Sequence, residues 1–93
     1  MKEISEEKLE KYFNITGKAL EEAKKSKNRT KLEEERKDFL DMIERYYKDA
    51  FYFKEKNDIV NAFSALVYAH GWLDAGARLG LFDVHNNKLF TVE

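Results

Sequence analysis

The chain has 93 residues, and its 17 basic and 18 acidic side chains give a formal net charge of −1. A chain of this length forms one domain around a single core, and a balanced charge supplies no general attraction to nucleic acid or to an anionic membrane. The absence of cysteine excludes a disulfide framework, a thiolate metal site and a cysteine nucleophile. We therefore expect one domain over residues 1–93, with function carried by local features of its surface.

No segment of the sequence has the pattern that enters or crosses a membrane. The first residues, MKEISEEKLEKYF, are charged and lack the apolar core of a signal peptide. No run of about 18 uncharged apolar residues is present that would span a bilayer. These features predict a soluble, cytoplasmic protein with no membrane partner.

The first predicted helix covers residues 5–27. Ser5 can cap its first free amides, and apolar residues then recur at helical spacing from Leu9 to Ala23, which places one stripe against a core. Gly17 borders that stripe. Because a glycine inside a helix costs about 1 kcal/mol relative to alanine, we interpret Gly17 as a point where another helix packs closely.

A patch of one charge sign follows where this helix ends. Between residues 24 and 31 the chain holds five basic side chains and no acid: Lys24, Lys25, Lys27, Arg29 and Lys31. As a functional feature this turn would contact phosphate groups, which makes a nucleic-acid-binding accessory protein one hypothesis for the chain. Cations at the end of a helix also complement its negative dipole, and this structural interpretation is favoured.

The second predicted helix covers residues 30–55. Thr30 and Glu33 have the spacing of a capping box, in which each side chain bonds the backbone amide of the other. A cluster of aromatic residues near the end of this helix consists of Tyr46, Tyr47, Phe51, Tyr52 and Phe53. Core packing is favoured over a stacking platform for flat ligands, because only Tyr52 points squarely away from the apolar seam.

The third predicted helix, residues 58–79, is the most apolar part of the chain and is expected to be central. Asn57 or Asp58 can cap its start, and Gly80 ends it. Gly76 is expected to let a neighbouring backbone approach. The helix is apolar on two sides, which is typical of a helix that is buried or shared with a partner. The second of these sides is the candidate interface, formed by Ala65, Tyr68, Trp72, Ala75 and Leu79.

One polar ladder on the third helix is the best candidate for chemistry, since His70, Asp74 and Arg78 follow one another at intervals of four. In a hydrolase, Asp74 would orient His70 as a general base and Arg78 would hold an anionic substrate. No nucleophile motif accompanies the ladder, and a structural role, in which His70 donates to the carboxylate one turn later, is favoured. A metal would need ligands beyond His70 and Asp74. We therefore predict no catalytic residue, no cofactor and no metal.

The tail after Gly80 is too apolar to be free in solution. Its apolar residues are Leu81, Phe82, Val84, Leu89, Phe90 and Val92. Either the tail folds back over the second apolar side of the third helix, or the two together form an interface with another chain.

The segment AFSALVYAHGWLDAGARLGLF, residues 62–82, resembles the signature of a family of small archaeal proteins known as domain of unknown function 357. The positions that carry the resemblance are His70, Gly71, Trp72, Asp74, Gly76 and Gly80. The resemblance implies a compact three-helix bundle of about this size and an archaeal, cytoplasmic origin. It brings no established activity, so it assigns no catalytic residue.

Taken together, these patterns predict an all-α fold, an antiparallel three-helix bundle with an ordered apolar C-terminal tail. The leading hypothesis for function is a small non-catalytic protein-interaction module, which self-associates through the third helix as a homodimer or binds another protein. The alternatives are a nucleic-acid-binding accessory protein that uses the basic turn and a hydrolase that uses His70, Asp74 and Arg78.

Overall fold

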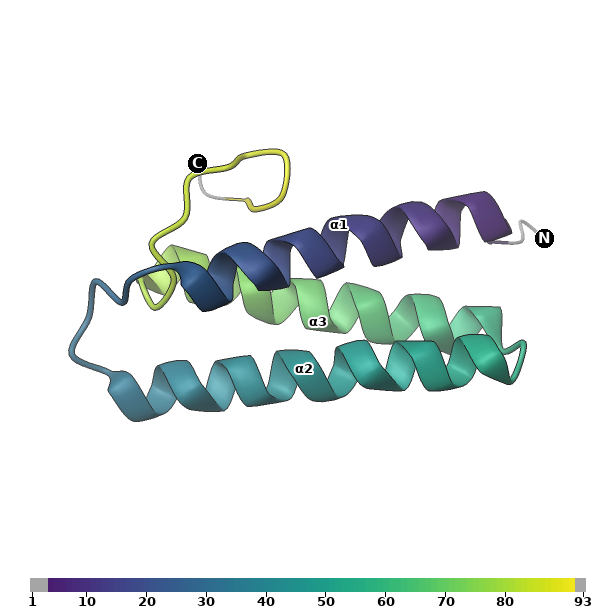
Figure 1. The fold of residues 1–93 in the computed structure, drawn as a ribbon, viewed down its shortest axis with the longest axis horizontal. Coiled ribbons are helices and arrows are strands. Elements are labelled where there is room, and N and C mark those ends of the chain that lie inside the picture. Colours follow the sequence, from purple (N-terminus) through teal and green to yellow (C-terminus); the bar gives the residue numbers. More distant parts are fainter. Residues whose placement is uncertain (1–3, 92–93) are drawn as a thin grey trace.

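The computed structural model describes residues 4–91 and consists of three helices (Figure 1). Helix α1 spans Glu6–Lys25, α2 spans Glu33–Glu55 and α3 spans Ile59–Leu79. The described residues contain no strand, so the prediction of an all-α three-helix bundle is confirmed. Each predicted helix boundary lies within three residues of the observed one.

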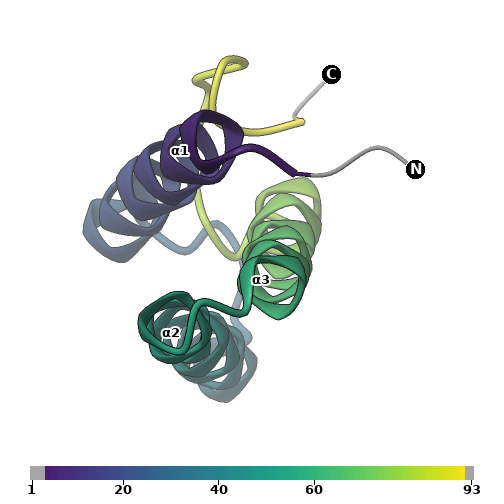
Figure 2. The ribbon, with the colours of Figure 1, turned by 90° about the vertical axis from the view of Figure 1, so that its right-hand side faces the viewer.

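Helix α3 occupies the centre of the bundle. The chain runs in one direction along α1, returns along α2 and turns again into α3 (Figure 1). Viewed along the helices, α3 lies beside both α1 and α2, whereas α1 and α2 approach each other less closely (Figure 2). The whole assembly measures 43 × 24 × 21 Å. The most apolar helix of the sequence therefore contacts both of the others.

Two of the three helix starts agree with the sequence. The Ser5 hydroxyl accepts a hydrogen bond from the amide of Lys8 at 3.1 Å, and the Asp58 carboxylate accepts one from the amide of Asn61 at 3.2 Å. Both are N-cap contacts that satisfy amides with no partner inside the helix. At the far end of α3, Gly80 adopts the left-handed conformation with φ of 88° and ends the helix as predicted.

The start of α2 differs from the prediction. The helix begins at Glu33 after Leu32, and Thr30 is not its N-cap. The Asn28 side-chain oxygen accepts hydrogen bonds from the Thr30 amide at 2.9 Å and from its hydroxyl at 2.6 Å, and the Thr30 hydroxyl oxygen accepts from the Leu32 amide at 3.0 Å. These local bonds offer the backbone an alternative to helix, so the predicted capping box is wrong.

The buried side chains form two clusters. The first lies toward the start of α1 and the α2–α3 turn and contains Leu9, Phe13, Ala50, Ala62, Ala65 and Leu66. The second lies toward the end of α3 and includes Leu20, Ile43, Leu73, Leu81, Phe82 and Phe90. Because the last three of these belong to the tail, the prediction of an ordered apolar tail is confirmed for the described residues. Val92, the last apolar residue of the predicted tail, lies outside them.

Close approaches account for two glycines inside helices. A Cβ atom at Gly17 would overlap the hydroxyl of Tyr47, so α2 does pack closely against α1 here, as predicted. A Cβ atom at Gly76 would overlap the ring of Phe82, which is fully buried. The predicted approach of a neighbouring backbone to Gly76 is therefore wrong, because the turn at Gly80 brings an aromatic side chain onto this surface instead.

Arg36 closes one end of the bundle. Its guanidinium donates to the carbonyl oxygens of Leu81 at 2.6 Å, Ser26 at 2.9 Å and Ala23 at 3.3 Å. The Ala23 carbonyl belongs to the last turn of α1, where carbonyls have no partner inside the helix, so a side chain of α2 caps α1. The same guanidinium lies 5.5 Å from the centre of the Phe82 ring. One side chain thus joins α1, α2 and the segment that follows α3.

Candidate functional site

His70 is a bridge between α1 and the tail. Its Nε2 atom lies 2.6 Å from the carbonyl oxygen of Leu89, and its Nδ1 atom lies 3.0 Å from the hydroxyl of Thr16. Because a carbonyl oxygen only accepts, Nε2 carries a proton and donates to Leu89, while Nδ1 makes the contact with the Thr16 hydroxyl. Both ring nitrogens are therefore used within the chain.

Asp74 and Arg78 do not extend this contact into a ladder. The Asp74 carboxylate accepts a hydrogen bond from the amide of Thr91 at 2.8 Å, whereas the Arg78 side chain is exposed. Within residues 4–91 no side-chain hydrogen bond or ion pair joins any two of His70, Asp74 and Arg78. The sequence places the three residues on one flank of α3, but the first two hold the tail instead of one another.

The tail folds back along α1 and the flank of α3 that faces it. Figure 1 shows it passing over the half of α1 that leads into α2. Val84 and Phe90 are buried there, and the His70 and Asp74 contacts hold the stretch between Leu89 and Thr91. The tail therefore orders itself within the chain. It does not cover the second apolar side of α3, because Tyr68 and Leu79 on that side stay 51% and 60% exposed.

Two of the five basic side chains of the turn pair with acids from other elements. Lys24 pairs with Glu44 at 3.3 Å and Arg29 with Asp83 at 3.5 Å. Lys25 lies 3.9 Å from Glu21 within α1. The backbone of the turn also pairs with the segment after α3, because the Arg29 amide donates to the Gly80 carbonyl at 2.9 Å. These contacts support the structural interpretation, since the turn attaches one connection of the bundle to another.

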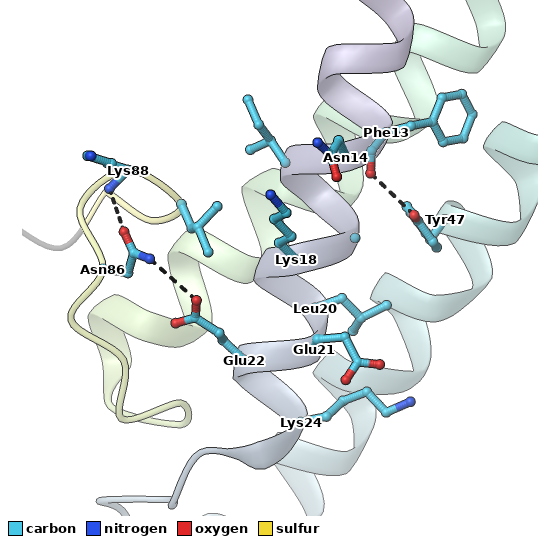
Figure 3. A pocket seen from close by; sticks show the side chains of 13 residues that line it. Phe13, Asn14, Lys18, Leu20, Glu21, Glu22, Lys24, Tyr47, Asn86 and Lys88 are labelled. Atoms are coloured by element: carbon cyan, nitrogen blue, oxygen red, sulfur yellow. Dashed lines mark hydrogen bonds between the residues drawn. The ribbon is translucent and has the colours of Figure 1, made fainter.

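A broad groove with a volume of about 900 Å³ runs along α1 (Figure 3). It is lined by basic and acidic side chains in mixed order, among them Lys18, Lys88 and Glu22. Asn86 on the tail donates to the Glu22 carboxylate at 3.4 Å, so part of the lining is engaged within the chain. The mixture of charges provides no set of side chains that converge on one ligand.

Tyr47 at the edge of this groove is a structural group. Its hydroxyl donates to the carbonyl oxygen of Phe13 at 3.2 Å, and burial raises the pKa of the phenol above its ordinary value of 10.0. A phenol with a raised pKa stays protonated at neutral pH and keeps donating this bond. Tyr47 therefore ties α2 to α1 and does not act as a base.

The candidate interface stripe on α3 is divided by α2. Ala65 is buried, and Trp72 is half-buried with its ring packed edge-on against Phe39 of α2 at 4.7 Å between ring centres. Tyr68, Ala75 and Leu79 are exposed. The stripe is therefore not exposed over its whole length, because Ala65 lies in the core and Trp72 packs against α2. Its role as an interface stays a prediction.

The uncovered surface of α3 is rotated by roughly 60° from the predicted stripe, given 100° for each residue of a helix. We call it the outer face of α3. Its residues, all exposed, are Val60, Ser64, Val67, Tyr68, Gly71, Ala75, Arg78 and Leu79. Figure 2 shows that no other helix of the described residues lies against the side of α3 that is turned away from α1 and α2. Four large apolar or aromatic side chains thus remain in solvent on the central helix.

A groove of about 660 Å³ runs across the outer face. It is lined by residues of α2 and α3, namely Phe39, Phe63, Ser64, Val67, Tyr68, Gly71, Trp72 and Ala75. None of these residues carries a charge, and most of the lining is apolar. Exposed apolar surfaces of this kind mark protein–protein contacts or ligand grooves.

Gly71 lies in this groove, and no contact within the described residues explains why this position is a glycine. A Cβ atom at this position would meet no other atom within 4 Å, in contrast to Gly17 and Gly76, where it would overlap a side chain. Gly71 also has no positive φ angle, since Gly80 is the glycine that does. A helical glycine costs about 1 kcal/mol relative to alanine, and nothing in the described part of the chain requires that cost here. The sequence shows a glycine inside the third helix, but its role can be inferred only once the side of α3 that faces solvent is known.

Residues 4–91 hold neither a cluster of metal ligands nor a membrane-spanning helix. No three His, Asp or Glu side chains in this range gather closely enough to hold a metal ion. No helix in the range is long and apolar enough to cross a bilayer. The cytoplasmic location stays a prediction.

The fold and this surface define the class of protein, a small all-α bundle whose central helix exposes an apolar groove. The chain belongs to the family described as "Protein of unknown function (DUF357)", whose model matches residues 11–82. The resemblance carried by the third helix is thereby confirmed. No curated protein and no solved structure matches the chain significantly. The family match includes the whole outer face of α3 and ends at Phe82, before the stretch of the tail that His70 and Asp74 hold.

Proposed function

We propose that the protein is a non-catalytic protein-interaction module and that the outer face of α3 is its docking surface. The observation that carries the proposal is Gly71, an exposed helical glycine in the lining of an uncharged apolar groove. A missing side chain is useful where another backbone comes close, and within the described part of this chain no backbone does. A partner helix packed across α3 at Gly71 supplies that neighbour.

The chemistry of the groove fits an apolar helical partner. Between Ile59 and Leu79 only Asp74 and Arg78 are charged, so most of this helix can lose its contact with water without burying a charge. Tyr68 and Trp72 line the groove, and large aromatic side chains of this kind are enriched among the residues that dominate binding energy. The partner surface we expect is therefore an apolar helix face with small residues at its centre.

Site-specific photocrosslinking inside the cells that make the protein tests this function. Tyr68 is replaced by p-benzoylphenylalanine, a photoreactive residue that keeps an aromatic ring at the docking surface. The matched control is the same replacement at Tyr52, which is 58% exposed on α2, while Tyr68 is 51% exposed. After irradiation, adducts are separated by mass and the crosslinked peptides are identified by mass spectrometry.

The two positions are expected to behave differently. The Tyr68 variant should give one major adduct in which the crosslinked peptide of the partner is apolar and helical, and the Tyr52 variant should give none above background. Equal labelling at both positions, or no adduct at Tyr68, would contradict the assignment of the outer face as a docking surface. Circular dichroism on both purified variants verifies that the helices persist.

A further inference from the structure

We propose that the occupant of the outer face is a second copy of this chain, docked α3 against α3 in antiparallel orientation with the two-fold axis passing through Gly71. This inference rests on the proposed function, because it names the partner of the same surface. It follows from the order of residues along the outer face, from the position of its one charge, and from the area that the face offers.

Three pairs of α3 residues along the groove and the outer face are complementary about Gly71. Four residues to either side stand Val67 and Ala75, so an antiparallel copy places the larger side chain of each pair opposite the smaller one. Eight residues to either side stand Phe63 and Leu79, an apolar pair of which Phe63 lines the groove and Leu79 is 60% exposed. Gly71 meets Gly71 at the crossing, where the two helix backbones come closest.

The single charge of the face selects the orientation. Arg78 lies seven residues after Gly71, and Ser64 lies seven residues before it. In the antiparallel pair each arginine is opposite a serine, whose hydroxyl accepts its hydrogen bond. In a parallel pair the two arginines would stand side by side and the two helix dipoles would be aligned, and both arrangements are repulsive.

The available area suits a dimer of moderate affinity. Helix α3 has 21 residues and is about 31 Å long. Packed along this length it would bury roughly 600 Å² on each copy, close to a tenth of the 6494 Å² of accessible surface of the chain. The resulting total of about 1,200 Å² stands at the lower end of specific interfaces, and we expect a dissociation constant in the micromolar range.

Disulfide trapping tests both the partner and the orientation, and the absence of native cysteine makes it clean. Two single-cysteine chains are made, Val67→Cys and Ala75→Cys, and one of them carries a tag that changes its mass. In the antiparallel pair the thiol introduced at position 67 of one copy lies opposite the thiol introduced at position 75 of the other, within reach of a disulfide. Two copies of position 67 are separated by eight residues, or about 12 Å along the axis, which is too far for a disulfide.

We expect a disulfide-linked dimer when the two variants are mixed under mild oxidation, and at least tenfold less when either is oxidised alone. Lys48→Cys, at an exposed position on α2, supplies the rate of random collision. Self-linking of Val67→Cys alone would overturn the antiparallel pair in favour of a parallel one. No link above the Lys48→Cys rate in any mixture would overturn the second copy as occupant.

Light scattering on the cysteine-free chain gives the second measurement. At several hundred micromolar we expect a mass near twice the 11.0 kDa of the chain, and Gly71→Leu should return it to 11.0 kDa with helix content unchanged. A wild-type mass that stays at 11.0 kDa overturns the inference. In that case a Tyr68 adduct with a different protein leaves the docking function standing, whereas the absence of any Tyr68 adduct removes both.

Discussion

The Nε2 atom of His70 donates a hydrogen bond to the carbonyl oxygen of Leu89, 19 residues further along the chain, over a distance of 2.6 Å. The opposite nitrogen of the same ring lies 3.0 Å from the hydroxyl of Thr16 on α1. One half-buried imidazole therefore connects three separate parts of the fold. These two contacts indicate that His70 holds the tail against the helices.

Replacing His70 by alanine should release the tail while the helices persist. The Leu89 carbonyl and the Thr16 hydroxyl both lose a partner, and we expect a loss of about 1–3 kcal/mol in the free energy of unfolding. Hydrogen exchange should show faster exchange of the amides of Leu89 and Phe90, with little change in α2. His85→Ala is the control and should change stability by less than about 0.5 kcal/mol, because its ring is exposed and reaches only Asp83. Unchanged exchange in the tail would contradict the bridge.

Two glycines of α3 should respond to alanine with opposite signs. Gly76→Ala places a methyl group against the buried ring of Phe82 and should cost about 1–3 kcal/mol after the gain in helix propensity. Gly71→Ala meets no atom within 4 Å and should stabilise the monomer by about 0.5–1 kcal/mol. Urea denaturation at submicromolar protein concentration, monitored by the fluorescence of Trp72, measures both changes in the free energy of unfolding. A destabilised monomer of Gly71→Ala would show that the position has a role inside the chain.

The stability that Tyr47 supplies should depend on pH. Because burial raises the pKa of its phenol in the folded state, the folded chain holds this proton more tightly than the unfolded chain. The contribution is therefore complete below pH 10 and is lost as the pH rises through the raised pKa. At pH 7, Tyr47→Phe should cost about 0.5–1.5 kcal/mol through the lost bond to Phe13. Urea denaturation of both proteins between pH 7 and 11 should show the gap closing above pH 10. A gap that stays constant would contradict this account.

Arg36 should contribute more to the free energy of unfolding than the exposed Arg45 does. Arg36→Met keeps the aliphatic stem but removes the donors to Leu81, Ser26 and Ala23, and we expect a cost of about 1.5–3 kcal/mol. The control is Arg45→Met, which removes an exposed pair with Asp41 at 2.9 Å and should cost less than about 0.5 kcal/mol. Thermal unfolding of the two variants decides the comparison. Equal effects would mean that the Arg36 contacts add little to stability.

Most of the fold could be predicted from local sequence signals. Apolar residues at helical spacing define all three helices, and the caps at Ser5 and Asp58 depend on a few neighbouring residues. The cap of α2 failed for the same reason that the others succeeded, because Asn28 offers Thr30 a stronger local partner than the helix does. Loop geometry decides between the predicted capping box and the hydrogen bonds of Asn28 to Thr30, and the order of residues alone does not specify that geometry.

The candidate site could be predicted only in part. The sequence identifies α3 as two-sided, but the side that α2 covers is set by the packing of whole helices. A rotation smaller than one residue moves Ala65 into the core and brings Val67 and Gly71 to the surface. His70 and Asp74 are polar residues on one flank in the sequence, and their partners come from a tail whose path no periodicity describes.

The contacts of Arg36 also set an order of events during synthesis. Helix α1 is made before α2, and the Arg36 guanidinium that donates to the Ser26 carbonyl is translated ten residues after Ser26. Arg36 also donates to the carbonyl oxygen of Leu81, which is made only after the central helix α3. The Arg36 contacts can therefore all form together only after Leu81, which follows α3, has been made.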